Sequence, residues 1–248
     1  MSEPKFYALI IGTEILNRRR EDKHFDFLSK ALEKKGFVLS GSFIINDDPD
    51  FIVQTIQFIA SQKNAILFSF GGIGSTPDDY TRQCASIALS DGLLPQHQEA
   101  KAIIEKKLGK NAYPHAINMA NLPKNSKLLY NPINQMPAFS LEEKYFFVPG
   151  FPEMSHPMLE KVIDKIVPQR VLYRKSLTAN CKESELIEVM KQMPKSVEFS
   201  SLPKLLENGW QVTISVASLD EKEMKSAFKC YTDDLTSKAI NYTLTDEN

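Results

Sequence analysis

The sequence predicts an α/β protein in which helices cover a mostly parallel sheet, followed by a small α+β domain. Strand and helix patterns alternate through residues 1–90. The strand-like segments are continuous apolar runs, which is typical of strands buried on both faces of a parallel sheet. After Pro168 the chain changes character to a small α+β pattern, in which Val212, Ile214 and Val216 occupy every second position, as on one face of a strand. We therefore place a domain boundary there, with a larger domain over 1–168 and a smaller one over 169–248.

The first three strand–helix pairs are predicted from apolar runs and from helix start and stop signals. The expected strands cover residues 6–12, 37–45 and 65–70. A helix over 22–35 joins the first two strands. Asp48 is a good N-cap and Pro49 is favoured at the first helical position, so the next helix starts there. A third helix follows the segment 71–79 and runs through Ala88. This order implies parallel strands with right-handed crossovers.

The rest of the chain is predicted in the same way. We expect a helix over 96–108, loops and short strands over 110–143, a strand over 144–151 and a helix over 153–167 that Pro168 ends. In the smaller domain the expected order is a strand at 170–177, a helix at 183–193, strands at 197–200 and 211–217, and a helix at 221–235.

Composition excludes several classes of protein. The 248 residues are 42% hydrophobic and 25% charged, as in an ordinary globular protein, and the net charge of −1 gives no general attraction to nucleic acid or anionic membrane. No apolar run approaches the ~20 residues of a membrane span, and the first residues lack a signal-peptide pattern. Cys84, Cys181 and Cys230 suit neither a disulfide framework nor a Cys-x-x-Cys metal site. We expect reduced thiols and a cytoplasmic protein.

Polar or glycine-rich segments follow four of the predicted strands, at 12–14, 46–48, 71–76 and 149–150. The carboxyl ends of parallel strands meet at one edge of a sheet, where ligands of open α/β sheets bind. Glycines let the backbone approach a ligand, and helix N-termini offer N–H groups to phosphate. Carboxylates beside a phosphate would hold a divalent cation. The pattern predicts a phosphate pocket with acids for a metal.

The same residues have a purely structural interpretation, which stays open at this point. Thr76-Pro77-Asp78-Asp79 is also a capping-box pattern, and Asp48 is also an N-cap. Gly-Gly-x-Gly matches neither a phosphate-binding Walker loop nor the dinucleotide fingerprint. The four histidines show no metal-ligand spacing, and we expect them in loops or at the surface: His24, His97, His115 and His156.

Several ordered motifs resemble those of the CinA (competence/damage-inducible protein A) family. GGIGSTPDDYT at 71–81 resembles its Gly-Gly-Leu-Gly-Pro-Thr-x-Asp-Asp-x-Thr signature. Further matches are IGTEILNRRREDKH at 11–24, INDDPDFI at 45–52, MANLP at 119–123, NPINQMPAF at 131–139 and VPGFPEM at 148–154. That family has the three-layer molybdopterin-binding, MogA/MoaB-like fold. The resemblance implies that 1–168 has this fold and that 169–248 is a KH-like domain.

The resemblance also implies an activity. CinA-type domains are similar to pyrophosphatases that need a divalent cation (Mg²⁺, Mn²⁺, Co²⁺ or Ni²⁺) and split ADP-ribose-like or FAD-like dinucleotides. MogA-like relatives instead bind molybdopterin and transfer an adenylyl group to it, so a binding or adenylyl-transfer module is the alternative. Relatives self-associate, which implies a dimer or trimer. Nucleic acid is not expected, because KH domains bind it through Gly-x-x-Gly and 169–248 contains only Gly209. We also expect no nicotinamide-mononucleotide deamidase activity.

The resemblance assigns roles to individual residues. Asp47 and Asp79 match catalytic acids, and Asp22 joins them as a metal ligand. The implied ligand-binding residues are Gly12, Glu14, Gly71, Gly72, Gly74, Ser75, Thr76, Asn131, Pro149 and Gly150. Departures from the family pattern are Arg18, Asn134 and Ala138 in place of glycines, His24 in place of Asn and Ser75 in place of Pro. Added side chains could close the pocket, so a diverged, non-catalytic binder stays open, and we expect Arg18 beside the phosphate loop.

Overall fold

The structure is a computed structural model that describes residues 3–207 and 209–245. The chain divides into two compact units, Met1–Pro168 and Gln169–Asn248, which are described separately. Each unit has its own hydrophobic core: that of the first extends from Phe6 to Val167, and that of the second from Leu177 to Leu235. No helix in the described ranges is both long and apolar enough to span a bilayer.

A six-stranded sheet of order β2-β1-β3-β6-β5-β4 forms the centre of the first unit. Its strands are β1 (Lys5–Ile11), β2 (Leu39–Ile45), β3 (Ala65–Phe70), β4 (Lys127–Leu129), β5 (Ala138–Leu141) and β6 (Tyr145–Val148). The four strands β2, β1, β3 and β6 are parallel, whereas β5 runs antiparallel to β6 and β4 antiparallel to β5. The predicted mostly parallel α/β sheet is therefore confirmed.

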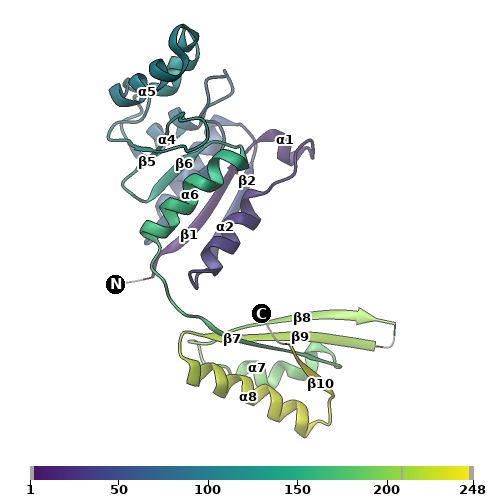
Figure 1. Cartoon of the computed structure of the whole chain (residues 1–248). Coiled ribbons are helices and arrows are strands. Elements are labelled where there is room, and N and C mark those ends of the chain that lie inside the picture. Colours follow the sequence, from purple (N-terminus) through teal and green to yellow (C-terminus); the bar gives the residue numbers. More distant parts are fainter. Residues whose placement is uncertain (1–2, 208, 246–248) are drawn as a thin grey trace. The chain divides into compact units, whose positions relative to one another are not determined.

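Helices flank this sheet. They are α1 (Thr13–Leu16), α2 (His24–Glu33), α3 (Pro49–Ala60), α4 (Thr81–Leu89), α5 (Gln98–Leu108) and α6 (Pro152–Ile166), with 3₁₀ turns at Gly109–Ala112 and Ala116–Ala120. Helices α2 and α6 pack together in front of the strands in Figure 1, and α3 packs against α4. Helix α3 starts as predicted, because the Asp48 carboxylate accepts a 2.9 Å hydrogen bond from the Phe51 N–H.

The second unit is an antiparallel sheet of order β10-β7-β9-β8 with helices against it (Figure 1). Its elements are β7 (Tyr173–Ala179), a 3₁₀ turn (Glu183–Leu186), α7 (Ile187–Lys191), β8 (Glu198–Leu206), β9 (Gly209–Ser218), α8 (Glu221–Ser237) and β10 (Tyr242–Thr245). The sequence did not predict β10, whose four residues are mostly exposed. Strand β8 continues through Pro203, beyond its predicted end, because an edge strand tolerates proline.

Candidate ligand-binding site

A cavity of about 540 Å³ opens where β1, β3 and β6 end at their carboxyl edge. Each of the four polar segments that follow predicted strands contributes to its wall. The contributors from those segments are Glu14, Asp47, Gly71, Gly72, Gly74, Ser75, Thr76, Pro149 and Gly150. The parallel topology thus gathers residues from four distant parts of the sequence around one space.

Gly71 and Gly72 form the first part of the glycine-rich turn after β3. Their φ angles are +100° and +67°, which side chains rarely adopt. A Cβ on Gly71 would lie 2.5 Å from the Ile11 carbonyl oxygen, and one on Gly72 would lie 2.2 Å from Thr81 Oγ1. Packing of the turn against its own chain therefore requires both glycines, independently of any ligand.

Asp79 holds the second part of this turn in shape. Its Oδ1 accepts a 2.9 Å hydrogen bond from the Gly74 N–H. Its Oδ2 accepts bonds of 2.8 and 2.5 Å from the Thr76 N–H and hydroxyl. The buried Arg82 guanidinium supports the turn from α4, where it donates a 2.7 Å bond to the Gly74 carbonyl, and its burial lowers its pKa.

The capping-box interpretation of residues 76–79 is wrong. Helix α4 begins only at Thr81, and the Thr76 hydroxyl donates to Asp79 instead of capping a helix N–H. Asp79 therefore stabilises the turn beside the cavity.

Asp47 and Glu14 are the other two predicted acids at the cavity. Asp47 Oδ2 accepts bonds of 2.8 Å from both the N–H and the hydroxyl of Thr13, which ties the end of β2 to the start of α1. The Glu14 carboxylate packs against Gly12: a Cβ added to Gly12 would lie 2.9 Å from Glu14 Oε2. Gly12 thus supports the site indirectly, by leaving room for the Glu14 carboxylate.

The cavity also has an apolar wall, which the sequence reasoning did not predict. Its residues are Ile10, Ile11, Ile15, Phe70, Ile73, Met119, Met136, Pro137, Phe151 and Met154. Methionine side chains are flexible and polarizable, and they contact flat rings well. Met119 and Met154 belong to recognisable motifs, but only the fold shows that they line the same space.

Three predicted residues do not line this cavity within the described parts of the chain: Gly12, Asp22 and Asn131. Asp22 accepts bonds of 2.9 and 3.1 Å from the N–H groups of His24 and Phe25, at the start of α2. Asn131 is buried, where its Oδ1 accepts a 3.0 Å bond from the Ile133 N–H and shapes a turn.

The expected metal set of Asp22, Asp47 and Asp79 is not assembled. In residues 3–207 and 209–245 no three His, Cys, Asp or Glu side chains gather so that they could hold a metal ion. Glu14 and Asp47 still line the cavity. Mg²⁺ takes one or two protein carboxylates and obtains its other ligands from phosphate and water, so Glu14 and Asp47 are the residues that could hold such a cation.

Arg18 also differs from the expectation. It is absent from the described residues that line the cavity, and its φ angle is +62°. The glycine that the resemblance places at this position suits that left-handed backbone. Arg18 thus replaces a conformational glycine away from the ligand space.

His24 and His156 form a pair that the sequence did not predict. His24 is only 2% exposed, so its expected loop or surface position is wrong. Its ring stacks on Phe70 with centroids 4.2 Å apart, its Nδ1 lies 3.2 Å from His156 Nε2, and its Nε2 lies 3.3 Å from the Gly150 carbonyl. Burial, followed by the charge of His156, lowers the pKa of His24 to about 4.

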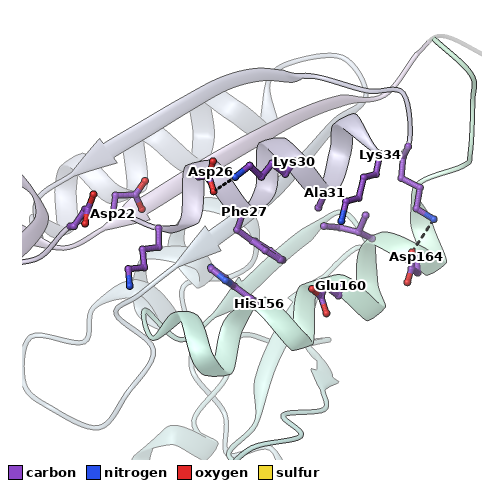
Figure 2. Close-up of a pocket in the computed structure, with 13 residues that line it drawn as sticks. Asp22, Asp26, Phe27, Lys30, Ala31, Lys34, His156, Glu160 and Asp164 are labelled. Carbon is purple, nitrogen blue, oxygen red and sulfur yellow. Dashed lines mark hydrogen bonds and ion pairs between the residues drawn. The ribbon is translucent and has the colours of Figure 1, made fainter. Parts of the chain in front are cut away.

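His156 belongs to α6 and faces a second hollow, a groove of about 750 Å³ between α2 and α6. Figure 2 shows its ring against that of Phe27, with centroids 3.9 Å apart. Burial also lowers the pKa of His156. The pair thus joins the wall of the cavity to the wall of this groove.

The fold and the cavity define an α/β domain of the molybdopterin-binding class. A family model described as "Probable molybdopterin binding domain" matches residues 7–169, and the chain belongs to this family. The MogA/MoaB-like fold and the CinA resemblance predicted from the motifs are confirmed.

Among its relatives, a putative competence-damage inducible protein of Bacillus pumilus is 24% identical over 241 residues, which cover 92% of this chain and 58% of that protein. A CinA-like protein of Geotalea uraniireducens is 28% identical over 176 residues, 68% of this chain and 41% of that one. A Caldivirga maquilingensis protein is 29% identical over 94% of this chain and 96% of its own length. The chain thus spans about half the length of the two bacterial relatives.

A solved structure of similar fold is that of CinA from Thermoplasma acidophilum, a protein of unknown function. It superposes with a TM-score of 0.59 and 26% sequence identity, and the match covers 66% of this chain and 99% of that one.

Proposed function

We propose that the first unit binds a dinucleotide such as ADP-ribose or FAD and, with a divalent cation, hydrolyses its phosphoanhydride bond. One observation carries this proposal: a single cavity combines a glycine-rich turn, carboxylates that include those of Glu14 and Asp47, and an apolar wall that includes three methionines. The turn suits phosphate, the carboxylates suit a cation and the apolar wall suits a heterocyclic ring.

The turn would bind phosphate through Ser75 and through backbone N–H groups. Asp79 already accepts hydrogen bonds from the N–H groups of Gly74 and Thr76, so these two donors serve the shape of the turn. The Gly71 N–H also has an internal partner, the Val148 carbonyl, at 3.0 Å. The Ser75 hydroxyl and the N–H groups of Gly72, Ile73 and Ser75 would then contact phosphate oxygens. The role of Asp79 in this proposal is to position the turn.

Charge explains why a cation is needed. The described lining residues include four carboxylates, of Glu14, Asp47, Asp78 and Asp79, against one guanidinium, of Arg20. A phosphate anion alone would be repelled by this excess of negative charge. A divalent cation (Mg²⁺, Mn²⁺, Co²⁺ or Ni²⁺) held by Glu14 and Asp47 would offset it, and when bound would polarise the phosphoryl group.

A second candidate function is binding without hydrolysis, with a nucleotide or molybdopterin as the ligand, as in a carrier or adenylyl-transfer module. This function is favoured by the finding that two of the predicted catalytic or metal-binding acids form hydrogen bonds to the backbone that stabilise local structure. Asp79 accepts three hydrogen bonds within its own turn, and Asp22 accepts two from N–H groups at the start of α2. Fewer carboxylates are then available for catalysis than the family motif implies.

Incubation with ADP-ribose or FAD and each cation, followed by chromatography for AMP, separates the two functions. We expect AMP release that chelation abolishes and that Glu14→Gln reduces at least tenfold. Glu33→Gln, an exposed acid on α2, is the matched control and should keep full activity. Calorimetric binding without AMP release would support the binding module, and absence of binding would contradict both functions.

We further infer from the resemblance that the protein is cytoplasmic and self-associates as a dimer or trimer. Light scattering coupled to size-exclusion chromatography tests the second inference. A purely monomeric species at micromolar concentration would contradict it.

A further inference from the structure

Arg20 is the only lysine or arginine among the described residues that line the cavity. Its guanidinium lies over the Phe151 ring, 5.1 Å from the centroid. Its Nη1 is 3.9 Å from Glu14 Oε1, and about a third of the side chain, 32%, is exposed. A cation in this position faces a space whose other described charged lining residues are carboxylates.

Local backbone structure brings Arg20 to the cavity and leaves its neighbours outside. The Arg18 N–H bonds the Ile15 carbonyl, and the left-handed φ of Arg18 then reverses the chain. The Arg20 N–H accordingly returns to the Glu14 carbonyl, at 3.0 Å. The Arg19 side chain bonds the Asn17 side chain at 3.1 Å, and Arg19 does not appear among the described lining residues.

The contact with Glu14 is too weak to explain why the Arg20 side chain lies at the cavity. At 3.9 Å it is a loose ion pair between partly exposed groups, and such pairs contribute little to stability. A guanidinium over an aromatic face keeps N–H donors at its edge, in a planar arrangement that suits phosphate. The contact with Phe151 thus holds Arg20 at the cavity while its donors remain able to bind an anion.

We propose that Arg20 is a second anion receptor of this cavity, and that the ligand carries at least two linked phosphates. One phosphate would lie at the 71–76 turn with the cation, and the next would bind Arg20. On binding, Arg20 would exchange its loose contact with Glu14 for phosphate oxygens, which leaves the Glu14 carboxylate to the cation. This inference rests on the proposed function, whose ligands carry a diphosphate, and it assigns the second of the two phosphates to Arg20.

Calorimetry with ADP and AMP in the presence of Mg²⁺ tests the proposal on the full chain. The parent should bind ADP at least tenfold more tightly than AMP. Arg20→Gln should weaken ADP binding at least tenfold and AMP binding by at most threefold. Arg20→Lys keeps the charge but not the planar donors, so its affinity for ADP should lie between those of the parent and of Arg20→Gln. Arg19→Gln makes the same charge change outside the cavity and should match the parent.

Each other outcome has a definite meaning. If the parent binds neither nucleotide, the proposed function fails. If the parent binds ADP but Arg20→Gln leaves the ADP-to-AMP preference unchanged, only the role of Arg20 is overturned. An equal loss of affinity for ADP and for AMP in Arg20→Gln would show that Arg20 supports the wall of the cavity instead. Thermal unfolding of each variant confirms that the comparison concerns folded protein.

Discussion

The His24–His156 pair should make the first unit lose stability as the pH falls below 6.5. In the unfolded chain His24 titrates near its ordinary pKa of 6.5, whereas in the fold its pKa is about 4. Burial is the main cause, and His156 on α6 and Arg20 oppose the charged ring further. The Gly150 carbonyl and Asp22 favour that charge but do not compensate.

The direction and size follow from proton linkage. Between pH 6.5 and about 4 the unfolded chain holds a proton at His24 that the folded chain lacks, so acidification favours unfolding. The contribution of neutral His24 is fully present above pH 6.5 and is lost by pH 4. Since each pKa unit corresponds to about 1.4 kcal/mol, this loss approaches about 3 kcal/mol. The lowered pKa of His156 acts in the same direction.

Thermal unfolding followed by far-UV circular dichroism from pH 7.5 to 4.5 measures this effect. His24→Asn, which introduces the residue that the family motif has there, should flatten the pH dependence relative to the parent. His115→Asn changes an exposed histidine and should retain the parental slope. The single tryptophan, Trp210, lies in the second unit, so its fluorescence follows that unit separately.

Two results would refute the reasoning. His24→Asn could keep the full parental loss of stability on acidification, or an NMR titration could show the His24 ring protonating near pH 6.5. In either case the buried ring would not be the proton-linked group.

Further predictions concern the turn, the arginine segment and the two units. Arg18→Gly should raise the free energy of unfolding by about 1 kcal/mol, because φ is +62° at this position and glycine adopts that angle without strain. Calorimetry should show an unchanged ligand affinity, and a less stable variant would contradict the prediction. Asp79→Asn should lower the free energy of unfolding by about 1–2 kcal/mol and weaken ligand binding, since one amide oxygen cannot accept all three hydrogen bonds. A parental melting temperature and a parental affinity would show that Asp79 does not hold the turn in shape. Residues 1–168 alone should melt cooperatively, as that unit has its own core, and an insoluble product would contradict this.

The elements that the sequence predicted well are those determined by local chemistry. The strands β1 and β3 are apolar at nearly every position, a pattern that only burial on both faces explains. Asp48 followed by Pro49 marks a helix start through one hydrogen bond within four residues. The parallel order then places four polar segments at one edge, so much of the polar half of the cavity was predictable.

The parts that were missed depend on contacts between distant residues. The histidines of the buried pair are 132 positions apart, and no local pattern relates them. The role of Asp79 depends on where α4 begins: a start at Thr76 would make it part of a capping box, whereas the observed start at Thr81 leaves it in the turn. The apolar wall combines methionines from a 3₁₀ turn (Met119), a loop (Met136) and helix α6 (Met154), which only the packed fold brings together.

The departures from the family motif change the chemistry of the cavity more than its shape. Arg18 lies outside the described lining and Ala138 is buried in β5, so neither added side chain fills the cavity. Asn134 does line it, but its side-chain oxygen accepts a 2.7 Å bond from Asn131 within its own turn, and a cavity of about 540 Å³ remains. One departure changes the charge properties of the site: His24, buried and neutral, stands where the motif has Asn. Arg20, at a position that the motif leaves open, supplies the one guanidinium among the described lining residues. The charges at these two positions therefore bear on which anion the cavity selects, and calorimetry on Arg20 variants measures that property directly.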